Sequence, residues 1–280
     1  MVQMNLRKLA KSLIRRRQRI RLKSYIDWTK RKWYSRPIHY QEIIDVLKKQ
    51  GDWKGRVVWV QSSWDEFFNV KIRPLEMIGI MQDLVGPTGT LVMPAFPIHA
   101  DLNKTLMIDS SPSSTGLLTE LFRRFPNVHR SIHLRSSVCA LGPQASQIVD
   151  AHHLTEYCWG PETPYDRIRD MRGLMVSLGS TPLGFTPLHY VECVLHNELN
   201  CFSKVFSGTT TYRWQRKNGD KGTHTFLNRH GHVRPQRIKK YFTDGLYQEA
   251  KLSNLRISSM AAYEGITRTI QLARDGITYY

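Results

Sequence analysis

Short apolar runs that alternate with helix-like segments constrain the fold of this chain more than any other feature. From Tyr40 onward, strand-length runs rich in β-branched residues are separated by segments in which apolar residues recur at three- and four-residue spacing. Such alternation is typical of a sheet covered by helices. We therefore expect an α/β fold with a mixed sheet flanked by helices. The expected strands are 57–60, 89–94, 137–141 and 174–179. Three helices are expected before and between them: one around 43–47, which stops near Gly51, one over 74–84 and one over 116–125.

The pattern changes after Cys201. Residues 209–216 and 223–227 alternate polar and apolar side chains, and Asn218-Gly219 lies between them. An Asn-Gly pair between two alternating segments predicts a β-hairpin in the C-terminal region. A final helix is expected over 259–274, with Ser258 or Ser259 as its N-cap.

The first 36 residues form a strongly basic segment. They carry a net charge of +12, whereas the other 244 residues carry +6. Leu6, Leu9, Leu13 and Ile14 recur at helical spacing among the cations, which predicts a basic amphipathic helix. This N-terminal extension, residues 1–36, would precede one α/β domain over 37–280. It could contact an anionic membrane surface as a peripheral element, or pack on the body or on a second subunit of a homo-oligomer.

Composition excludes several classes of protein. Neither an apolar run of about 18 residues nor a secretory signal pattern occurs, so we expect a cytoplasmic protein, at the inner membrane surface if the basic extension binds lipid. The four cysteines form no C-x-x-C pair, which favours reduced thiols. Nothing after residue 37 is typical of a nucleic-acid-binding fold, and neither GxxxxGK[ST] nor GxGxxG occurs.

The segment from Thr186 to Glu192 is the strongest candidate for chemistry. Thr186 and Pro187 are typical of a helix start, which would place His189 in the first turn, after a strand and a glycine-containing loop. Ligands of open α/β sheets bind at the carboxyl ends of strands. Glu192, three residues on, would share a helix face with His189 and could orient its imidazole as a general base. The alternative is a core histidine bonded to a neighbouring acid.

A zinc site is a second interpretation of the same helix. His189, Cys193 and His196 follow one another at four- and three-residue spacing, so their side chains could form one stripe of ligands in a metal-dependent hydrolase. The spacing matches no recognised zinc motif, and a buried cysteine on an apolar helix face is common. The acid–base interpretation is therefore preferred, and no metal is expected.

Two polar clusters are ambiguous by themselves. Ser62 and Ser63 follow the strand 57–60, where hydroxyl groups can hold a pyrophosphate or a pantetheine amide, or simply form a polar turn. Arg130 and Ser131 open a second cluster, and an arginine flanked by hydroxyls suits phosphate recognition.

Taken in order, these segments resemble the aminoglycoside 3-N-acetyltransferase family. The resemblance runs from about Tyr40 to Leu199. Residues 85–94 are similar to the family's V-G-x-x-G-T-L-V-M-P, residues 130–137 to its R-S-x-H-P-x-x-S, and residues 186–192 to its T-x-L-H-x-x-E. Further matches are Ser62-Ser63 to V-H-S-S-L, residues 113–123 to S-x-x-G-x-x-x-E-x-F-R, residues 142–145 to G-x-x-A and residues 163–165 to S-P-Y.

The resemblance implies an N-acetyltransferase with acetyl-CoA as donor and an amino sugar as acceptor, in which the amine attacks the thioester directly. It implies that His189 is the catalytic base and Glu192 its acidic partner. The residues that it assigns to coenzyme A are Ser62, Ser63, Ser113, Arg130, Ser131 and His133.

Several positions depart from the family pattern. Gln61 stands where the family has His, and Leu134 replaces a proline. The segment 227–241 is basic, with Arg234, Arg237, Lys239 and Lys240, where drug-modifying members carry acids. Because a basic groove would repel a polycation, we expect an anionic nucleotide-linked amino sugar from surface-polysaccharide synthesis as the acceptor. The alternative is an aminoglycoside antibiotic.

Overall fold

The computed structural model describes residues 25, 28–99 and 101–280. Most of the predicted basic extension, residues 1–24 and 26–27, lies outside the described residues, and residues 28–33 are helical. None of the helices in the described part of the chain combines the length and the apolarity that crossing a bilayer requires.

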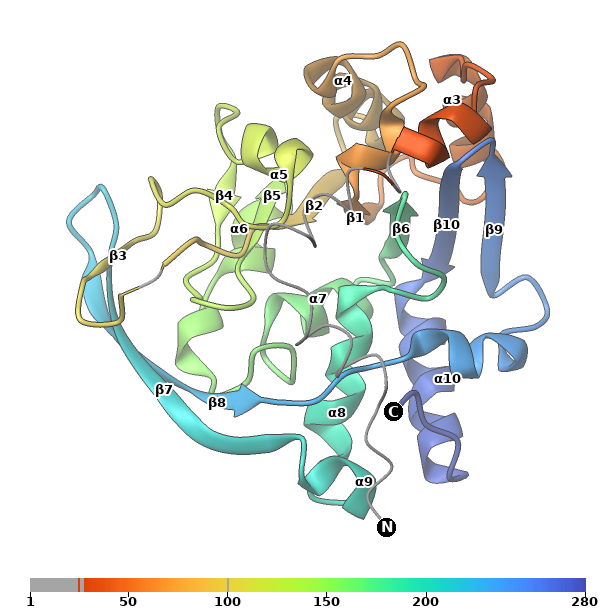
Figure 1. Ribbon diagram of the computed structural model, residues 1–280. Helices are drawn as coiled ribbons and strands as arrows, with labels where there is room; N and C mark the ends of the chain where they lie inside the picture. Colours follow the sequence, from red (N-terminus) through yellow and green to blue (C-terminus); the bar gives the residue numbers. More distant parts are fainter. Residues whose placement is uncertain (1–24, 26–27, 100) are drawn as a thin grey trace.

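A seven-stranded mixed sheet forms the centre of the molecule, which confirms the expected fold class (Figure 1). Its order is β4-β5-β2-β1-β6-β10-β9. The middle strand β1 is parallel to β2 and to β6, whereas β5 and β10 join antiparallel on either side. The strands are β1 Val57–Ser62, β2 Thr90–Pro94, β4 His129–Arg130, β5 Val138–Leu141, β6 Leu174–Leu178, β9 Tyr247–Leu252 and β10 Leu255–Ala261.

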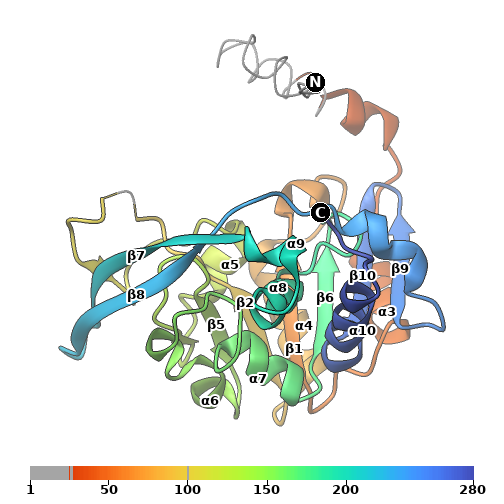
Figure 2. The same ribbon diagram turned by 90° about the horizontal axis from the view of Figure 1, so that it is seen from below.

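The two faces of the sheet belong to two separate apolar cores. Along β1, Val57 and Trp59 lie in one core, while Val58 and Val60 lie in the other. Successive side chains of a strand point to opposite faces, so a continuous apolar run indicates a strand covered on both sides. The core that contains Val58 and Val60 is covered by helices α3 Tyr40–Lys49, α4 Pro74–Val85 and α5 Leu117–Phe122. The core that contains Val57 and Trp59 is covered by α6 Ala145–Val149, α7 Pro164–Asp170, α8 Tyr190–Leu195 and α10 Ala262–Arg274 (Figure 2).

The predicted hairpin exists and is longer than expected. Strands β7 Phe206–Gln215 and β8 Lys221–Arg229 pair antiparallel and arch along one side of the body (Figures 1 and 2). Gly219 has a φ of 97° at the tip, a backbone conformation that glycine adopts without a steric penalty. The short strand β3 Leu106–Met107 completes this second sheet, and the far end of β8 brings Arg229 back towards α8.

The predicted start of the last helix is wrong. Ser258 and Ser259 do not cap α10: they lie in β10, between β6 and β9, and both are buried. The Ser259 hydroxyl donates to the carbonyl of Gln50 at 2.8 Å, so strand pairing and this bond satisfy groups that would otherwise suit a helix cap. The remaining elements are η1 Trp64–Phe67, η2 His152–Leu154, η3 Thr186–His189, α9 Asn200–Ser203 and η4 Pro235–Tyr241.

Candidate active site

The candidate site begins where β1 and β6 end at the same edge of the sheet. Gly179 follows β6 with a φ of +82°, and a Cβ there would lie 2.8 Å from the Glu66 Cβ and 3.0 Å from the Ser63 carbonyl oxygen. Only glycine fits this close approach between the loop after β6 and the segment after β1. The loop then leads into η3 and the predicted catalytic segment.

Gln61 holds this loop in place. Its side-chain oxygen accepts hydrogen bonds from the backbone N–H of Thr186 at 3.0 Å and from the Thr186 hydroxyl at 3.3 Å, and its side-chain N–H donates to the Gly184 carbonyl. The departure from the family pattern at position 61 therefore has a structural function here, because the amide fixes both sides of one turn.

The local geometry around His189 differs from the predicted helix start. Thr186 is the first residue of the 3-10 turn η3 rather than a cap, and the residue before it is Phe185. His189 ends η3 and serves as the residue before α8. The backbone nevertheless stays helical across the junction, so His189 and Glu192 share one face as expected.

His189, Glu192 and Arg229 form one hydrogen-bonded chain. The His189 Nδ1 lies 3.1 Å from Glu192 Oε1. The Arg229 guanidinium binds both oxygens of the same carboxylate, Nε to Oε2 at 2.5 Å and Nη2 to Oε1 at 2.9 Å. Glu192 is fully buried, whereas the His189 side chain is 21% exposed. A buried carboxylate thus links a cation on the hairpin to an imidazole that solutes can reach.

The charge of Glu192 is set by its two partners. Burial by itself would raise the pKa of this carboxyl, but His189 and Arg229 outweigh it and lower the pKa to about 2. The group is therefore an acceptor at neutral pH, and the His189 Nδ1 must donate to it. This leaves Nε2 of a neutral imidazole with the free lone pair, which a general base requires.

Residues that the sequence analysis missed support this arrangement. Arg229 also donates to the Tyr280 hydroxyl at 3.2 Å, and the Tyr279 hydroxyl donates to the Leu188 carbonyl at 3.2 Å. The Trp159 ring packs at 4.9 Å from the His189 ring. In the sequence, Arg229 is one of many cations of a basic segment, so no local signal distinguishes it.

A cavity of about 290 Å³ opens beside His189. Its walls come from the loop after β6, from η3 and from the segment that leads into η4. The lining residues are Thr181, Gly184, Phe185, Thr186, Leu188, His189, Val233, Pro235, Gln236 and Tyr279. A mostly apolar cavity with few polar groups is typical of a small-molecule site.

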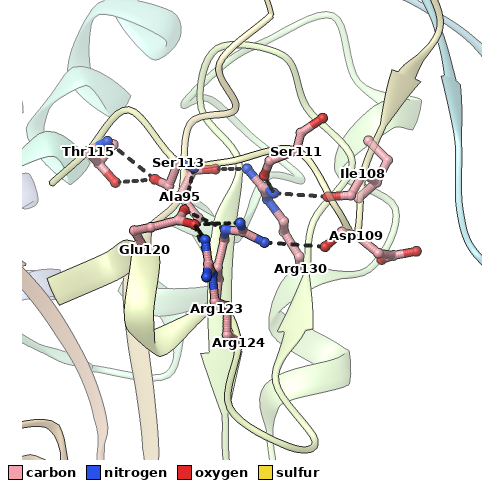
Figure 3. Close-up of polar contacts among 10 residues, drawn as sticks. All are labelled: Ala95, Ile108, Asp109, Ser111, Ser113, Thr115, Glu120, Arg123, Arg124 and Arg130. Atoms are coloured by element: carbon pink, nitrogen blue, oxygen red, sulfur yellow. Dashed lines mark hydrogen bonds and ion pairs between the residues drawn. The ribbon is translucent and has the colours of Figure 1, made fainter. Parts of the chain in front are cut away.

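The predicted coenzyme A residues fall into two groups. Ser62 and Ser63 are partly exposed at the end of β1, at the edge of the sheet where His189 lies. Ser113 and Arg130 are buried and belong to the polar network of Figure 3. The Arg130 guanidinium donates to the carbonyls of Ile108, Ser111 and Ala95 and to the Ser137 hydroxyl, while the Ser113 N–H donates to Glu120 at 2.7 Å.

Ser131 and His133 are also in the interior. Ser131 is within 3.0 Å of His152 Nδ1, and His133 Nδ1 accepts the backbone N–H groups of Arg135 and Ser136. In this conformation Arg130, Ser131 and His133 bind the protein itself and stabilise the loops around the site. Their contact with coenzyme A stays a prediction, as does that of Ser62, Ser63 and Ser113.

The buried histidines predict an acid-sensitive fold. The rings of His133 and His152 stack at 4.6 Å, and His224 meets His133 edge-on at 5.0 Å. Burial lowers the pKa of all three, that of His152 from 6.5 to about 3. Since the unfolded chain then binds more protons, the free energy of unfolding should fall as the pH drops below about 6.5. His152 should contribute roughly 1.4 kcal/mol per pH unit down to about pH 3.

Urea unfolding at a series of pH values measures this slope. His152→Gln should flatten it, and His232→Gln, at an exposed histidine, should leave it unchanged. A slope that His152→Gln does not alter would contradict the assignment.

The alternative zinc site has no ligand set in the residues described. Across residues 28–99 and 101–280, no group of three or more His, Cys, Asp or Glu side chains is arranged to hold a metal ion. The thiol of Cys193 is buried, and His196 Nδ1 is bonded to the Cys193 carbonyl at 2.9 Å rather than directed at a shared centre with His189.

Comparisons with known proteins agree on one family. The sequence model of a family described as aminoglycoside 3-N-acetyltransferase matches residues 59–272. Aminoglycoside N(3)-acetyltransferase IV from a Salmonella species is 32% identical over 152 residues, which cover 54% of this chain and 57% of the relative. Aminoglycoside N(3)-acetyltransferase III from Pseudomonas aeruginosa is 25% identical over 174 residues, with 56% and 64% covered. The matched segments thus span less than two thirds of these relatives.

Solved structures share the fold. The crystal structure of the aminoglycoside acetyltransferase AAC(3)-Xa has a TM-score of 0.72 at 20% identity and covers 91% of this chain and 99% of its own. The apoenzyme of AAC(3)-IVa has a TM-score of 0.69 at 25% identity, with 87% and 92% covered.

The predicted nucleotide-linked acceptor from surface-polysaccharide synthesis is wrong, because the family description and the names of these relatives specify aminoglycosides. The basic segment that motivated it is partly compensated: Lys239 pairs with Glu249 at 3.1 Å, and Lys240 lies over the Tyr241 ring. The net charge of segment 227–241 therefore does not equal the charge that this segment presents to the site.

The match over residues 59–272 extends across most of the chain, and it includes most of β1, the loop after β6 and the linked residues His189, Glu192 and Arg229. The motif order, the mixed sheet and this match agree, and the chain belongs to the aminoglycoside 3-N-acetyltransferase family.

Proposed function

We propose that this protein transfers the acetyl group of acetyl-CoA to the 3-amino group of an aminoglycoside. The observation that carries the proposal is the bond from His189 Nδ1 to the ionised Glu192, which leaves Nε2 as a base beside a small-molecule cavity. Membership of the family supports the choice of donor and acceptor, and so do the names of the relatives.

The chemistry needs one base and no covalent enzyme intermediate. His189 Nε2 takes the proton of the acceptor amine as its nitrogen bonds to the thioester carbonyl carbon. The C–S bond then breaks, its electron pair leaves with sulfur, and the imidazolium returns the proton to give a free thiol. Glu192 stabilises the imidazolium between these two transfers, and Arg229 keeps Glu192 ionised.

The residues around His189 fit the reacting end of acetyl-CoA. The apolar walls from Phe185, Leu188 and Val233 suit the acetyl group and the pantetheine arm and exclude water from the thioester. Ser62 and Ser63, at the same edge of the sheet, could bond the pantetheine amides. Acetyl-CoA supplies the activated acyl group, and the protein supplies the base and its orientation.

The first test is direct. Purified protein with acetyl-CoA and gentamicin, sisomicin or apramycin should release free thiol, and mass spectrometry with NMR should locate the acetyl group on the 3-amino nitrogen. Acetyl-CoA without acceptor should raise the melting temperature, because a ligand that binds only the folded state stabilises it. Absence of thiol release with every aminoglycoside, in protein that acetyl-CoA does stabilise, would contradict the proposed acceptor.

We also infer that residues 1–36 form a basic extension before a single domain over 37–280, and that the extension contacts anionic membrane surfaces. Its net charge of +12 supports this, as do the exposed rings of Trp28 and Trp33. Sedimentation with anionic vesicles should decrease with salt and on deletion of residues 1–24. Equal sedimentation of both proteins would contradict the membrane contact. Assembly into a homo-oligomer stays a prediction.

A further inference from the structure

We propose that a basic cavity next to the His189 cavity binds the phosphate groups of the acyl donor, and that Lys30 from the N-terminal extension completes it. The proposal rests on the proposed function, because it assumes a thioester donor that carries phosphates. It adds a donor-binding residue that lies outside the segment matched by the family model, residues 59–272.

The basic cavity has a volume of about 280 Å³ and lies against the loop after β6. Its charged lining residues in the described part of the chain are three cations, Lys30, Lys251 and Arg256, and one carboxylate, Glu66. Gly179, Ser180 and Thr181 also line this cavity. A concave site with an excess of cations attracts anions such as phosphates.

Thr181 connects this basic cavity to the site of chemistry. It lines both the basic cavity and the His189 cavity, so the two spaces lie on either side of one residue. No lysine or arginine is among the described residues that line the His189 cavity. The phosphates of a coenzyme A thioester must therefore lie elsewhere, while its long pantetheine arm reaches His189.

A second cavity with cations is a poorer candidate. It is larger, about 870 Å³, and includes Arg130, Arg216 and Lys221, but it shares none of its described lining residues with the His189 cavity. The Arg130 guanidinium already donates to three backbone carbonyls. Arg216 is also paired with Asp109 at 2.9 Å. Among the described residues, no shared lining residue connects that cavity to the one beside His189, so a donor with its phosphates there has no evident path to the base.

The contacts of the extension explain how Lys30 reaches the basic cavity. Lys30 Nζ lies 2.5 Å from Glu66, and Lys251 Nζ donates to the Tyr34 hydroxyl at 3.0 Å while lying over the Tyr34 ring. The Glu66 backbone carbonyl is in turn held by Asn254 at 2.6 Å. These contacts join residues 30–34 to both β9 and the segment after β1, so the extension forms one wall of the cavity.

The charge balance favours an anion once the donor arrives. Glu66 neutralises one cation, and Arg256 also pairs through Nη1 with Glu249 outside the cavity lining. Among the residues described, the Lys251 ammonium donates to the neutral Tyr34 hydroxyl and lies in no ion pair, and it has three donors. A phosphate can therefore take charge-assisted bonds from Lys251 without breaking an ion pair, and Lys30 lies beside it on the same wall.

The experiment compares two donors that differ only in their nucleotide part. Lys251→Ala removes a charge-assisted contact, and Lys30→Ala leaves the Glu66 carboxylate without its cation in the same cavity. Each variant should therefore raise KM for acetyl-CoA by about tenfold with little change in kcat. Neither should alter kcat/KM for S-acetylpantetheine, which has no phosphate. Lys32→Ala is the matched control, because Lys32 is exposed on the same helical turn and contacts the Trp28 ring.

The outcomes separate this proposal from the proposed function. Wild-type turnover of S-acetylpantetheine with an aminoglycoside tests the function without any phosphate. Unchanged KM for acetyl-CoA in Lys30→Ala and Lys251→Ala would overturn the phosphate site, and so would equal losses with both donors. Acetyl-dephospho-CoA distinguishes the two sources of phosphate: a retained effect identifies the diphosphate, and a lost effect identifies the ribose 3′-phosphate.

Discussion

Replacing His189 with alanine is expected to lower kcat by a factor of roughly 10²–10⁴, the range typical of a lost general base. The affinity for coenzyme A should stay nearly unchanged, because the imidazole acts on the acceptor proton rather than on the donor nucleotide. Steady-state kinetics with an aminoglycoside, together with calorimetric titration of coenzyme A, measure the two quantities separately.

Two further variants make this result interpretable. His189→Asn keeps a polar side chain of similar reach, so it should fold and still lose the rate. His196→Gln is the matched control at the other end of α8, since His196 Nδ1 is bonded to the Cys193 carbonyl and, in the described structure, not to Glu192. A His189→Ala protein that keeps wild-type turnover would refute the assignment, and one that only unfolds would indicate a core histidine.

Replacing Arg229 with methionine should lower the free energy of unfolding by about 3–5 kcal/mol, because it leaves the fully buried Glu192 carboxylate without its cation. Arg229 is one of the two partners that lower the pKa of Glu192, so its loss raises that pKa and the carboxyl can take up a proton more readily as the pH falls. The loss of stability should therefore be largest at high pH and smaller at low pH. Urea unfolding at several pH values measures it.

The double variant Glu192→Leu/Arg229→Met removes both charges together. Because an apolar pair often replaces a buried ion pair without loss, it should recover most of the stability. It should not recover the rate, since His189 then has no carboxylate to orient it. If Arg229→Met is as stable as the wild type at every pH, Arg229 does not hold Glu192. If the double variant is fully active, neither residue positions the base.

Local sequence patterns were sufficient for four of the seven strands of the central sheet and for the contact between two residues of the candidate site. Strands β1, β2 and β6 contain the short apolar runs, because burial on both faces requires apolar side chains at successive positions. His189 and Glu192 are three residues apart, so backbone geometry alone brings them together. The same patterns failed at Ser258 and Ser259, where a helix cap and a buried strand present the same polar residues.

The rest of the site depends on contacts between segments far apart in the chain. Arg229 meets Glu192 from 37 positions away, Gln61 holds Thr186 from 125 positions away, and Lys30 meets Glu66 from 36 positions away. No periodicity encodes such pairs, because the hairpin and the sheet edge bring them together only after the chain has folded. The charge of segment 227–241 misled the acceptor prediction for the same reason: formal charge follows from composition, but the tertiary structure decides which charges are paired and which face a ligand. By itself, the sequence determined the fold class, the family motifs and the His189–Glu192 pair, whereas only the tertiary structure joined Arg229 to that pair and Lys30 to the loop beside it.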